Sequence, residues 1–133
     1  MKKIALLCVF VISVFVFCTA DSAFAASAGD AVFGKAVGFY KDGKMSDAAK
    51  SFGSAGDAYL KEKNKAKAAQ SYYFQGQCLS ANSQPQPALE AFKKAETQYE
   101  AAGDNAGLCK AIFFSAQLCL DAMEWDEAKA YYD

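Results

Sequence analysis

The chain has 133 residues, which is enough for one modest domain. Its formal net charge is −1, which does not fit a basic nucleic-acid-binding surface. It contains no histidine, and every basic residue is a lysine. Histidine is the usual side-chain base near neutral pH, and arginine is the usual two-pronged donor to phosphate and carboxylate groups. The composition therefore excludes the commonest enzyme and nucleic-acid sites.

The segment 1–25 has the pattern of a cleaved signal peptide. Two lysines precede an apolar run over positions 4–17, and a small-x-small sequence ends at Ala25. This run is shorter than the ~20 residues that span a bilayer, so we favour cleavage after Ala25 over a retained anchor or a lipid on Cys18. We expect the segment 26–133 to be exported, either to a periplasm or by secretion, with no stable membrane span after cleavage.

Small and apolar residues recur through the rest of the chain at a step of 40 positions, called the repeat step below. The recurring sets are Ala36, Gly76 and Ala116; Phe39, Leu79 and Cys119; Ala48, Ala88 and Ala128; and Phe52, Phe92 and Tyr132. Small residues that face one another let two helix axes approach to ~8–10 Å. The pattern predicts pairs of helices that meet at these small residues, with the aromatic side chains packed beside the contact.

Breaks between the apolar patterns predict six helices. The segments "KDGK" (41–44) and "NSQPQP" (82–87) are typical of turns, and a cap is expected at Asn64, Ser83, Asp104 and Asp126. The expected helices cover positions 28–41, 46–62, 65–81, 86–101, 105–122 and 126–133.

Three segments carry a family resemblance: "GKMSDAAKSFGSA" (43–55), "QPQPALEAFKKA" (84–95) and "MEWDEAKAYYD" (123–133). They resemble the turn and second helix of the tetratricopeptide repeat, although the repeat step is longer than the period of about 34 residues that is usual in that family. The resemblance covers almost all of the chain after the expected signal peptide, and it is specific for architecture rather than for a ligand.

The resemblance implies an all-α fold, a right-handed α-solenoid of stacked antiparallel helical hairpins. The expected TPR-like repeat domain is 26–133, with units at about 29–68, 69–108 and 109–133. The third unit is truncated, because the last helix carries only half of a second helix's apolar face. We therefore expect Ile112, Leu118, Cys119 and Trp125 to be poorly covered. Either the protein self-associates through this open C-terminal end, or the chain is the N-terminal part of a longer array.

In this family the first helices of the hairpins line a concave groove that holds a peptide or helix of a partner protein. The repeat places one aromatic residue in each unit on that surface. The candidate groove residues are Phe33, Val37, Tyr40, Tyr73, Gln77, Phe113 and Gln117. The alternative is that the aromatic members of this set belong to the core, as aromatic residues at helical spacing usually do.

We favour an exported protein-binding scaffold whose aromatic groove suits an apolar or amphipathic segment, and the alternative is a homo-oligomeric structural module. No catalytic residue, metal or cofactor is expected, because the sequence has no base–nucleophile pair, ligand cluster or phosphate loop. Cys78, Cys109 and Cys119 are expected to be free thiols in the core, and a bridge between Cys78 and Cys119 is the alternative.

Overall fold

The computed structural model of the chain describes residues 26–132, with side chains described as far as Met123. That part of the chain is folded into α-helices with no strand, so the predicted all-α class is confirmed. The helices are α2 (Ala28–Lys41), α3 (Met45–Lys61), α4 (Lys65–Ala81), α5 (Pro85–Ala102) and α6 (Asn105–Tyr132). The expected signal peptide and Asp133 lie outside the described residues.

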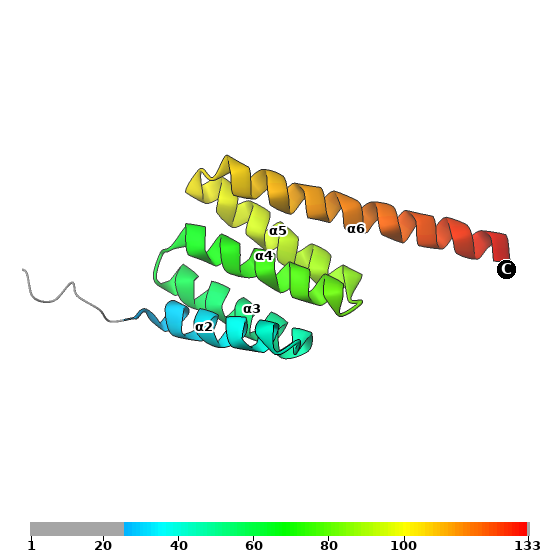
Figure 1. Cartoon of the computed structure of the whole chain (residues 1–133). Helices are drawn as coiled ribbons and strands as arrows, with labels where there is room; N and C mark the ends of the chain where they lie inside the picture. Colours follow the sequence, from blue (N-terminus) through cyan, green and yellow to red (C-terminus); the bar gives the residue numbers. More distant parts are fainter. Residues whose placement is uncertain (1–25, 133) are drawn as a thin grey trace, which may run out of the picture.

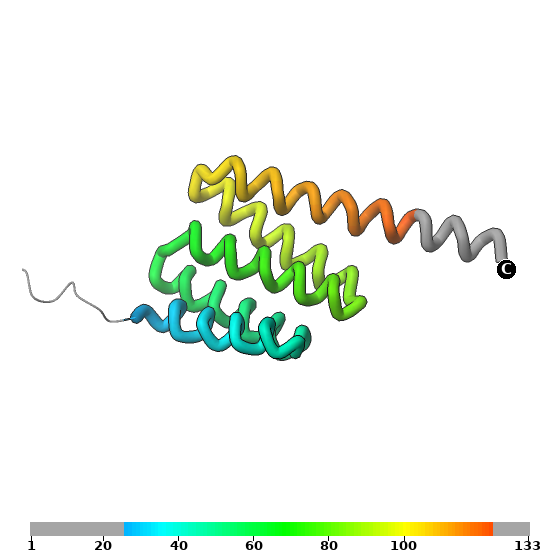
Figure 2. Tube along the Cα trace, in the orientation of Figure 1, coloured from blue at the N-terminus to red at the C-terminus, as the bar shows by residue number. Residues whose placement is uncertain are grey.

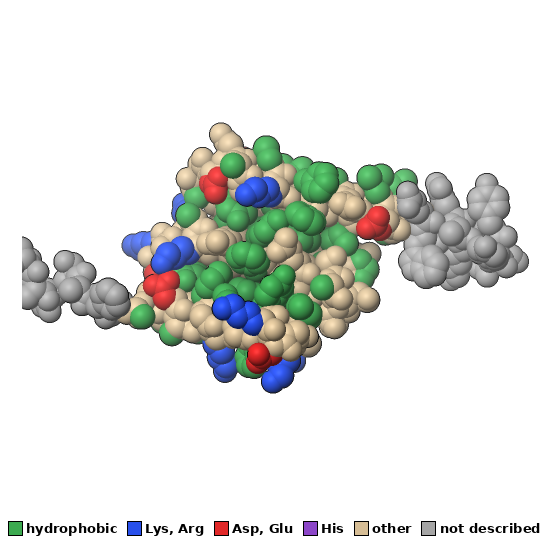
Figure 3. All heavy atoms as spheres, viewed as in Figure 1, with side chains coloured by type: hydrophobic (Ala, Val, Ile, Leu, Met, Phe, Trp, Pro, Cys, Tyr) green, Lys and Arg blue, Asp and Glu red, His purple; other side chains and the backbone are tan. Residues whose placement is uncertain are grey.

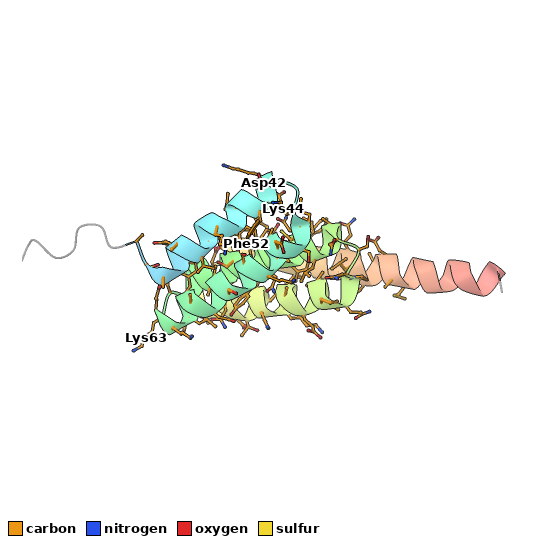
Figure 4. The ribbon with its side chains drawn as sticks, turned by 90° about the horizontal axis from the view of Figure 1, so that it is seen from below. Asp42, Lys44, Phe52 and Lys63 are labelled. Atoms are coloured by element: carbon orange, nitrogen blue, oxygen red, sulfur yellow. The ribbon has the colours of Figure 1, made fainter. Side chains whose placement is uncertain are left out.

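Each helix packs against the helix before it and the helix after it (Figures 1 and 2). Helix α4 is enclosed between α3 and α5, whereas α6 packs mainly against α5 and touches α4 at few points. The connecting turns alternate between two ends of the molecule. Figure 4 shows Asp42 and Lys44 at the turn between α2 and α3 and Lys63 at the opposite end, with Phe52 between the two turns.

The four turns share one backbone conformation and follow one another at a regular spacing, half of the repeat step. A residue with positive φ stands at Gly43 (74°), Lys63 (59°), Ser83 (57°) and Gly103 (72°). In each turn the next backbone N–H donates to the carbonyl of the residue five positions earlier, as from Lys44 to Phe39 at 2.9 Å. This 6→1 bond satisfies the last carbonyls of the helix and reverses the chain.

The sequence-based expectation of a break near 123–125 is wrong. Met123 is the next position in the series of turns, but it does not have positive φ, and α6 continues through it as one helix of 28 residues. The segment around Met123 contains no glycine or proline, and methionine and glutamate favour helix. The separate helix 126–133 and the cap at Asp126 are therefore also wrong.

Two of the other predicted caps are confirmed. The Asn64 side chain accepts a hydrogen bond from the backbone N–H of Lys67 at 3.2 Å, and Asp104 accepts one from Gly107 at 2.9 Å. Ser83 is not a cap, because it takes the left-handed conformation within the turn instead. Helix α5 begins shortly after it at Pro85, where a missing backbone N–H has no cost.

The small residues of the repeat are buried in the first four helices, as predicted. Ala36, Ala48 and Ala88 are fully buried, and Gly76 is buried beside Phe92. A Cβ atom on Gly76 would lie 2.7 Å from the Phe92 ring, so only glycine fits there without a shift. This part of the predicted core is confirmed.

The same prediction is wrong for α6. Ala116 and Cys119 are exposed, although both stand in the repeat columns of buried or half-buried residues. The reason is that no described helix covers this side of α6 as α5 covers α4. The exposure of Ile112 and Cys119 agrees with the poor cover expected at the open end, whereas Leu118 is half-buried. The side chain of Trp125 lies outside the described residues.

Candidate partner-binding groove

Aromatic side chains from three helices pack into a first triad. Phe33 of α2, Phe52 of α3 and Phe74 of α4 have ring centroids 5.3 Å (Phe33–Phe52), 6.0 Å (Phe33–Phe74) and 5.4 Å (Phe52–Phe74) apart. Edge-to-face and offset contacts of this kind stabilise aromatic pairs beyond the area they bury. The triad joins two successive first helices to the second helix between them.

A second triad stands one repeat step later at each position. Tyr73 of α4, Phe92 of α5 and Phe114 of α6 have centroids 5.8 Å (Tyr73–Phe92), 5.7 Å (Tyr73–Phe114) and 5.8 Å (Phe92–Phe114) apart. The ring of Tyr73 also contacts Phe74 at 5.9 Å, so the two triads form one continuous row. The Tyr73 hydroxyl accepts a hydrogen bond from Gln77 at 3.1 Å, and burial raises its pKa.

The candidate groove residues divide between this row and the open surface. Phe33 and Tyr73 are half-buried members of the triads, so part of each ring belongs to the core. Val37 and Gln77 are also half-buried, whereas Gln117 is exposed.

The two remaining aromatic candidates are the most exposed. Tyr40 is 47% exposed, and Phe113 is 62% exposed and reaches the row only through Phe114, at 5.6 Å. The structure therefore brings Phe33 and Tyr73 into one row and leaves Tyr40 and Phe113 outside it. That any of these residues binds a partner stays a prediction.

A groove with a volume of about 400 Å³ lies between α4 and α6. It is lined by Ala66, Lys67, Gln70, Tyr73, Phe74, Tyr99, Asp104, Ala106, Gly107 and Lys110. Tyr73 is the one residue of the sequence-predicted set in this lining. Figure 3 shows hydrophobic side chains gathered over α4 and along α6, with lysine and carboxylate side chains around their margin.

The equivalent position between α2 and α4 is bridged by polar contacts. The Asp30 carboxylate accepts hydrogen bonds from the Lys67 ammonium at 2.7 Å and from the Tyr59 hydroxyl at 2.6 Å. The bond from Lys67, followed by the bond from Tyr59, lowers the pKa of Asp30 to about 2. Burial and the adjacent carboxylate raise the pKa of Tyr59, so its hydroxyl stays protonated and keeps donating.

Sequence differences explain why the second groove is open. The residues one repeat step after Asp30, Tyr59 and Lys67 are Gln70, Tyr99 and Gly107. The Gln70 side chain has no charge and Gly107 has no side-chain ammonium group, so the ion pair that Asp30 and Lys67 form cannot form here. Burial, with a smaller effect of Asp104, raises the pKa of Tyr99 to about 12, and its hydroxyl remains a neutral hydrogen-bonding group beside the groove.

The groove and its triads contain residues that the sequence analysis missed. Phe74 and Phe114 are themselves one repeat step apart, so the same reasoning could have found them. Lys67, Gln70 and Lys110 had no comparable signal, because each sits on an exposed, ordinary-looking helix face in sequence. Only the packing of α4 beside α6 brings them together.

The cysteines divide by burial. Cys78, Cys109 and Cys119 are all free, so the alternative bridge between Cys78 and Cys119 does not form. Cys78 is buried as expected, and burial raises the pKa of its thiol to about 11. Cys109 and Cys119 are exposed, which corrects their assignment to the core. Among the described residues, no group of three or more potential metal ligands comes together.

Helix α6 is long and apolar enough over Asn105–Met123 to cross a membrane, by length and composition alone. In the structure this segment packs along α5, where the Ser115 hydroxyl donates to the Glu96 carboxylate at 2.5 Å. A carboxylate beside the helix is costly inside hydrocarbon. The α5 side of this segment is therefore occupied by protein in the structure.

Comparison of the chain with protein-family models, curated proteins and solved structures gave no match.

Proposed function

We propose that the chain is an exported protein-binding scaffold, a right-handed α-solenoid of stacked hairpins similar to tetratricopeptide-repeat proteins. Support comes from the two aromatic triads, which are related by the repeat step that the sequence predicts. The recurrence of one turn conformation at Gly43, Lys63, Ser83 and Gly103 adds to it. The signal-peptide pattern of the segment 1–25 supports export, and mass spectrometry of the protein from its host tests it through a mature N-terminus at Ala26.

The observation that carries the proposal is the open groove between α4 and α6. Its volume of about 400 Å³ lies within the range of pockets that hold small ligands and peptide side chains. The first such position in the chain is bridged by the Lys67–Asp30 pair, while the second has no such bridge and is lined by the half-buried rings of Tyr73 and Phe74. Because the second position lacks this bridge, we infer that it is available for a ligand.

The lining specifies the kind of segment that fits. Tyr73 and Phe74 offer apolar ring surface, and Gln70 offers both a donor and an acceptor to a peptide backbone. Lys110 at the rim favours an acidic side chain over a basic one. The proposed ligand is therefore an amphipathic segment of a partner protein, extended or helical, with an apolar residue over the rings and an acidic residue near Lys110.

A groove-filling substitution tests the proposal. Ala106 is exposed and lines the groove, so Ala106→Trp should block it with little effect on the fold. Ala101→Trp is the matched control, because Ala101 is exposed on α5 and does not line the groove. Partners captured by chemical cross-linking in the native host, and identified by mass spectrometry, should be lost with Ala106→Trp and retained with Ala101→Trp.

Equal capture by both variants would overturn the proposed site. Thermal melting of the two variants provides the check on folding, and it should shift little in either. A partner that binds both variants equally well while both remain folded would place the binding surface elsewhere.

A further inference from the structure

The ring of Tyr99 is buried, but its hydroxyl opens into the groove between α4 and α6. The residue lines the groove, and only 7% of it is exposed. Within the described part of the chain this hydroxyl makes no hydrogen bond, and no fully enclosed polar side-chain atom there lacks a partner, so solvent reaches the hydroxyl. A nearly buried polar group without a partner marks a place where a polar group of a ligand can bind.

Two other buried tyrosines show which partner such a hydroxyl takes in this fold. Tyr59 stands one repeat step before Tyr99, and its hydroxyl donates to the Asp30 carboxylate at 2.6 Å. The Tyr72 hydroxyl donates to the Asp57 carboxylate at 2.5 Å. In both cases a carboxylate from the preceding helix completes the tyrosine.

Each of these pairs is accompanied by a lysine from the following helix. The Lys67 ammonium lies 5.4 Å from the centre of the Tyr59 ring, and the Lys94 ammonium lies 5.7 Å from the centre of the Tyr72 ring. A cation at this distance offsets part of the negative charge of the carboxylate beside the ring. The recurring arrangement is therefore a carboxylate, a tyrosine hydroxyl and a lysine from three successive helices.

The groove repeats the tyrosine and the lysine but not the carboxylate. The Tyr99 ring lies against Gly107 of α6, where a Cβ atom would be 2.4 Å from the ring. Lys110 follows three positions later on the same face of α6 and also lines the groove. Side chains of a helix lean toward its N-terminus, so the Lys110 side chain extends back toward the ring. The position equivalent to Asp30 is Gln70, which is exposed and carries no charge.

The one carboxylate in the groove lining does not supply the missing partner. Asp104 caps α6 by accepting a hydrogen bond from the backbone N–H of Gly107 at 2.9 Å. It acts on Tyr99 through its charge and not through a hydrogen bond, adding to the effect of burial on the pKa of that hydroxyl. Among the described residues the one ion pair is Lys67–Asp30, so Lys110 is free to pair with a carboxylate from outside the chain.

We propose that the groove binds a carboxylate side chain of a partner segment, which accepts a hydrogen bond from the Tyr99 hydroxyl and pairs with the Lys110 ammonium. The ligand thereby supplies the group that Asp30 supplies within the chain. An apolar residue of the same segment lies over Tyr73 and Phe74. The site rests on the proposed function and adds to it the class of group that is bound and Tyr99 as the residue that selects it.

A matched pair of small probes tests the carboxylate. The probe 3-phenylpropanoate has an aromatic ring and a carboxylate, and 3-phenylpropanamide has the same shape without the charge. In NMR titrations of protein purified from its host, the carboxylate should bind more tightly than the amide and should shift the resonances of Tyr99 and Lys110. Tyr99→Phe removes only the hydroxyl and should weaken binding of the carboxylate by about tenfold, as expected for a hydrogen bond to a charged group, and binding of the amide much less.

Tyr72→Phe is the matched control, because the Tyr72 hydroxyl donates to Asp57 and the residue does not line the groove. It should lower the melting temperature and leave the affinity for 3-phenylpropanoate unchanged. Tyr99→Phe should leave the melting temperature near the wild-type value, since its hydroxyl has no partner to lose. Equal affinity of the wild-type protein for both probes, binding of neither, or full affinity for the carboxylate in folded Tyr99→Phe protein would each overturn the site.

An internal carboxylate provides a second measurement. Gln70→Asp places a carboxylate at the position equivalent to Asp30, so it should compete with 3-phenylpropanoate and weaken its binding by about tenfold. Gln70→Asn shortens the side chain equally without the charge and should have little effect. Equal affinity of these two variants for the probe would contradict the arrangement.

Partner capture separates this site from the proposed function. Loss of the partner with Ala106→Trp but normal capture with Tyr99→Phe would retain the groove and reject the carboxylate site. Equal capture with Ala106→Trp and Ala101→Trp, together with Tyr99-dependent binding of 3-phenylpropanoate, would reject the proposed function and retain the carboxylate site.

Discussion

Helices α4 and α6 occupy equivalent positions one repeat step apart, but their surroundings differ. Helix α4 is enclosed between α3 and α5, and Gly76 and Cys78 on it are buried. Within the described part of the chain, helix α6 is packed mainly on its α5 side. The residues at matching positions, Ala116 and Leu118, are exposed and half-buried respectively. The comparison teaches that the repeat sets which residues are suited to burial, whereas the neighbouring helix decides whether they are buried.

The largest expected difference is between two aromatic residues. Phe92→Ala should lower the free energy of unfolding by about 3–5 kcal/mol, because Phe92 is fully buried in the second triad and its loss leaves a cavity. Phe113→Ala should lower it by less than about 1 kcal/mol, because most of that ring is already in solvent. Urea denaturation of dilute protein measures both, and similar losses would show that α6 is covered as fully as α4.

A second pair sharpens the comparison at the small residues. Gly76→Leu should cost about 1–3 kcal/mol of stability, since even a Cβ atom there would lie 2.7 Å from the Phe92 ring. Ala116→Leu should change the free energy of unfolding by less than about 0.5 kcal/mol in dilute protein, because the site is open. Denaturant midpoints of the two variants provide the measurement. A tolerated leucine at 76 would mean that α4 and α5 are not held at this distance.

The smallest expected effect concerns the closed and open grooves. The folded-state pKa of Asp30 is about 2, below its usual 3.8, so this carboxylate stabilises the fold fully above pH 3.8. That stability is lost as the pH falls from 3.8 through about 2. Asp30→Asn should remove this part of the acid sensitivity, as seen in melting curves over that pH range.

Gln70→Asn is the matched control for that measurement, because Gln70 stands at the equivalent position of the open groove and has no titrating group. Its acid sensitivity should equal that of the wild-type protein. An unchanged acid profile in Asp30→Asn would show that the contact with Lys67 contributes nothing measurable, as many exposed ion pairs do.

The candidate site was predictable only in part. Tyr73 followed from the repeat step, and Phe74 was accessible to the same reasoning. The polar residues that separate an open groove from a closed one were not, because Asp30, Tyr59 and Lys67 are far apart in sequence and meet only through the packing of α2, α3 and α4. A side chain's partner across two helices depends on their separation and rotation, which local sequence does not specify.

The sequence by itself determined the all-α class, the repeat step, the small-residue contacts and most of the helix boundaries. These features depend on local helix propensity and on the helical period, and short segments of sequence determine both. Only the tertiary structure decided that α6 continues through Met123 and that Ala116 is exposed. Continuation past Met123 is a balance between helix propensity and the packing of a returning helix, and burial at Ala116 depends on whether such a helix is present.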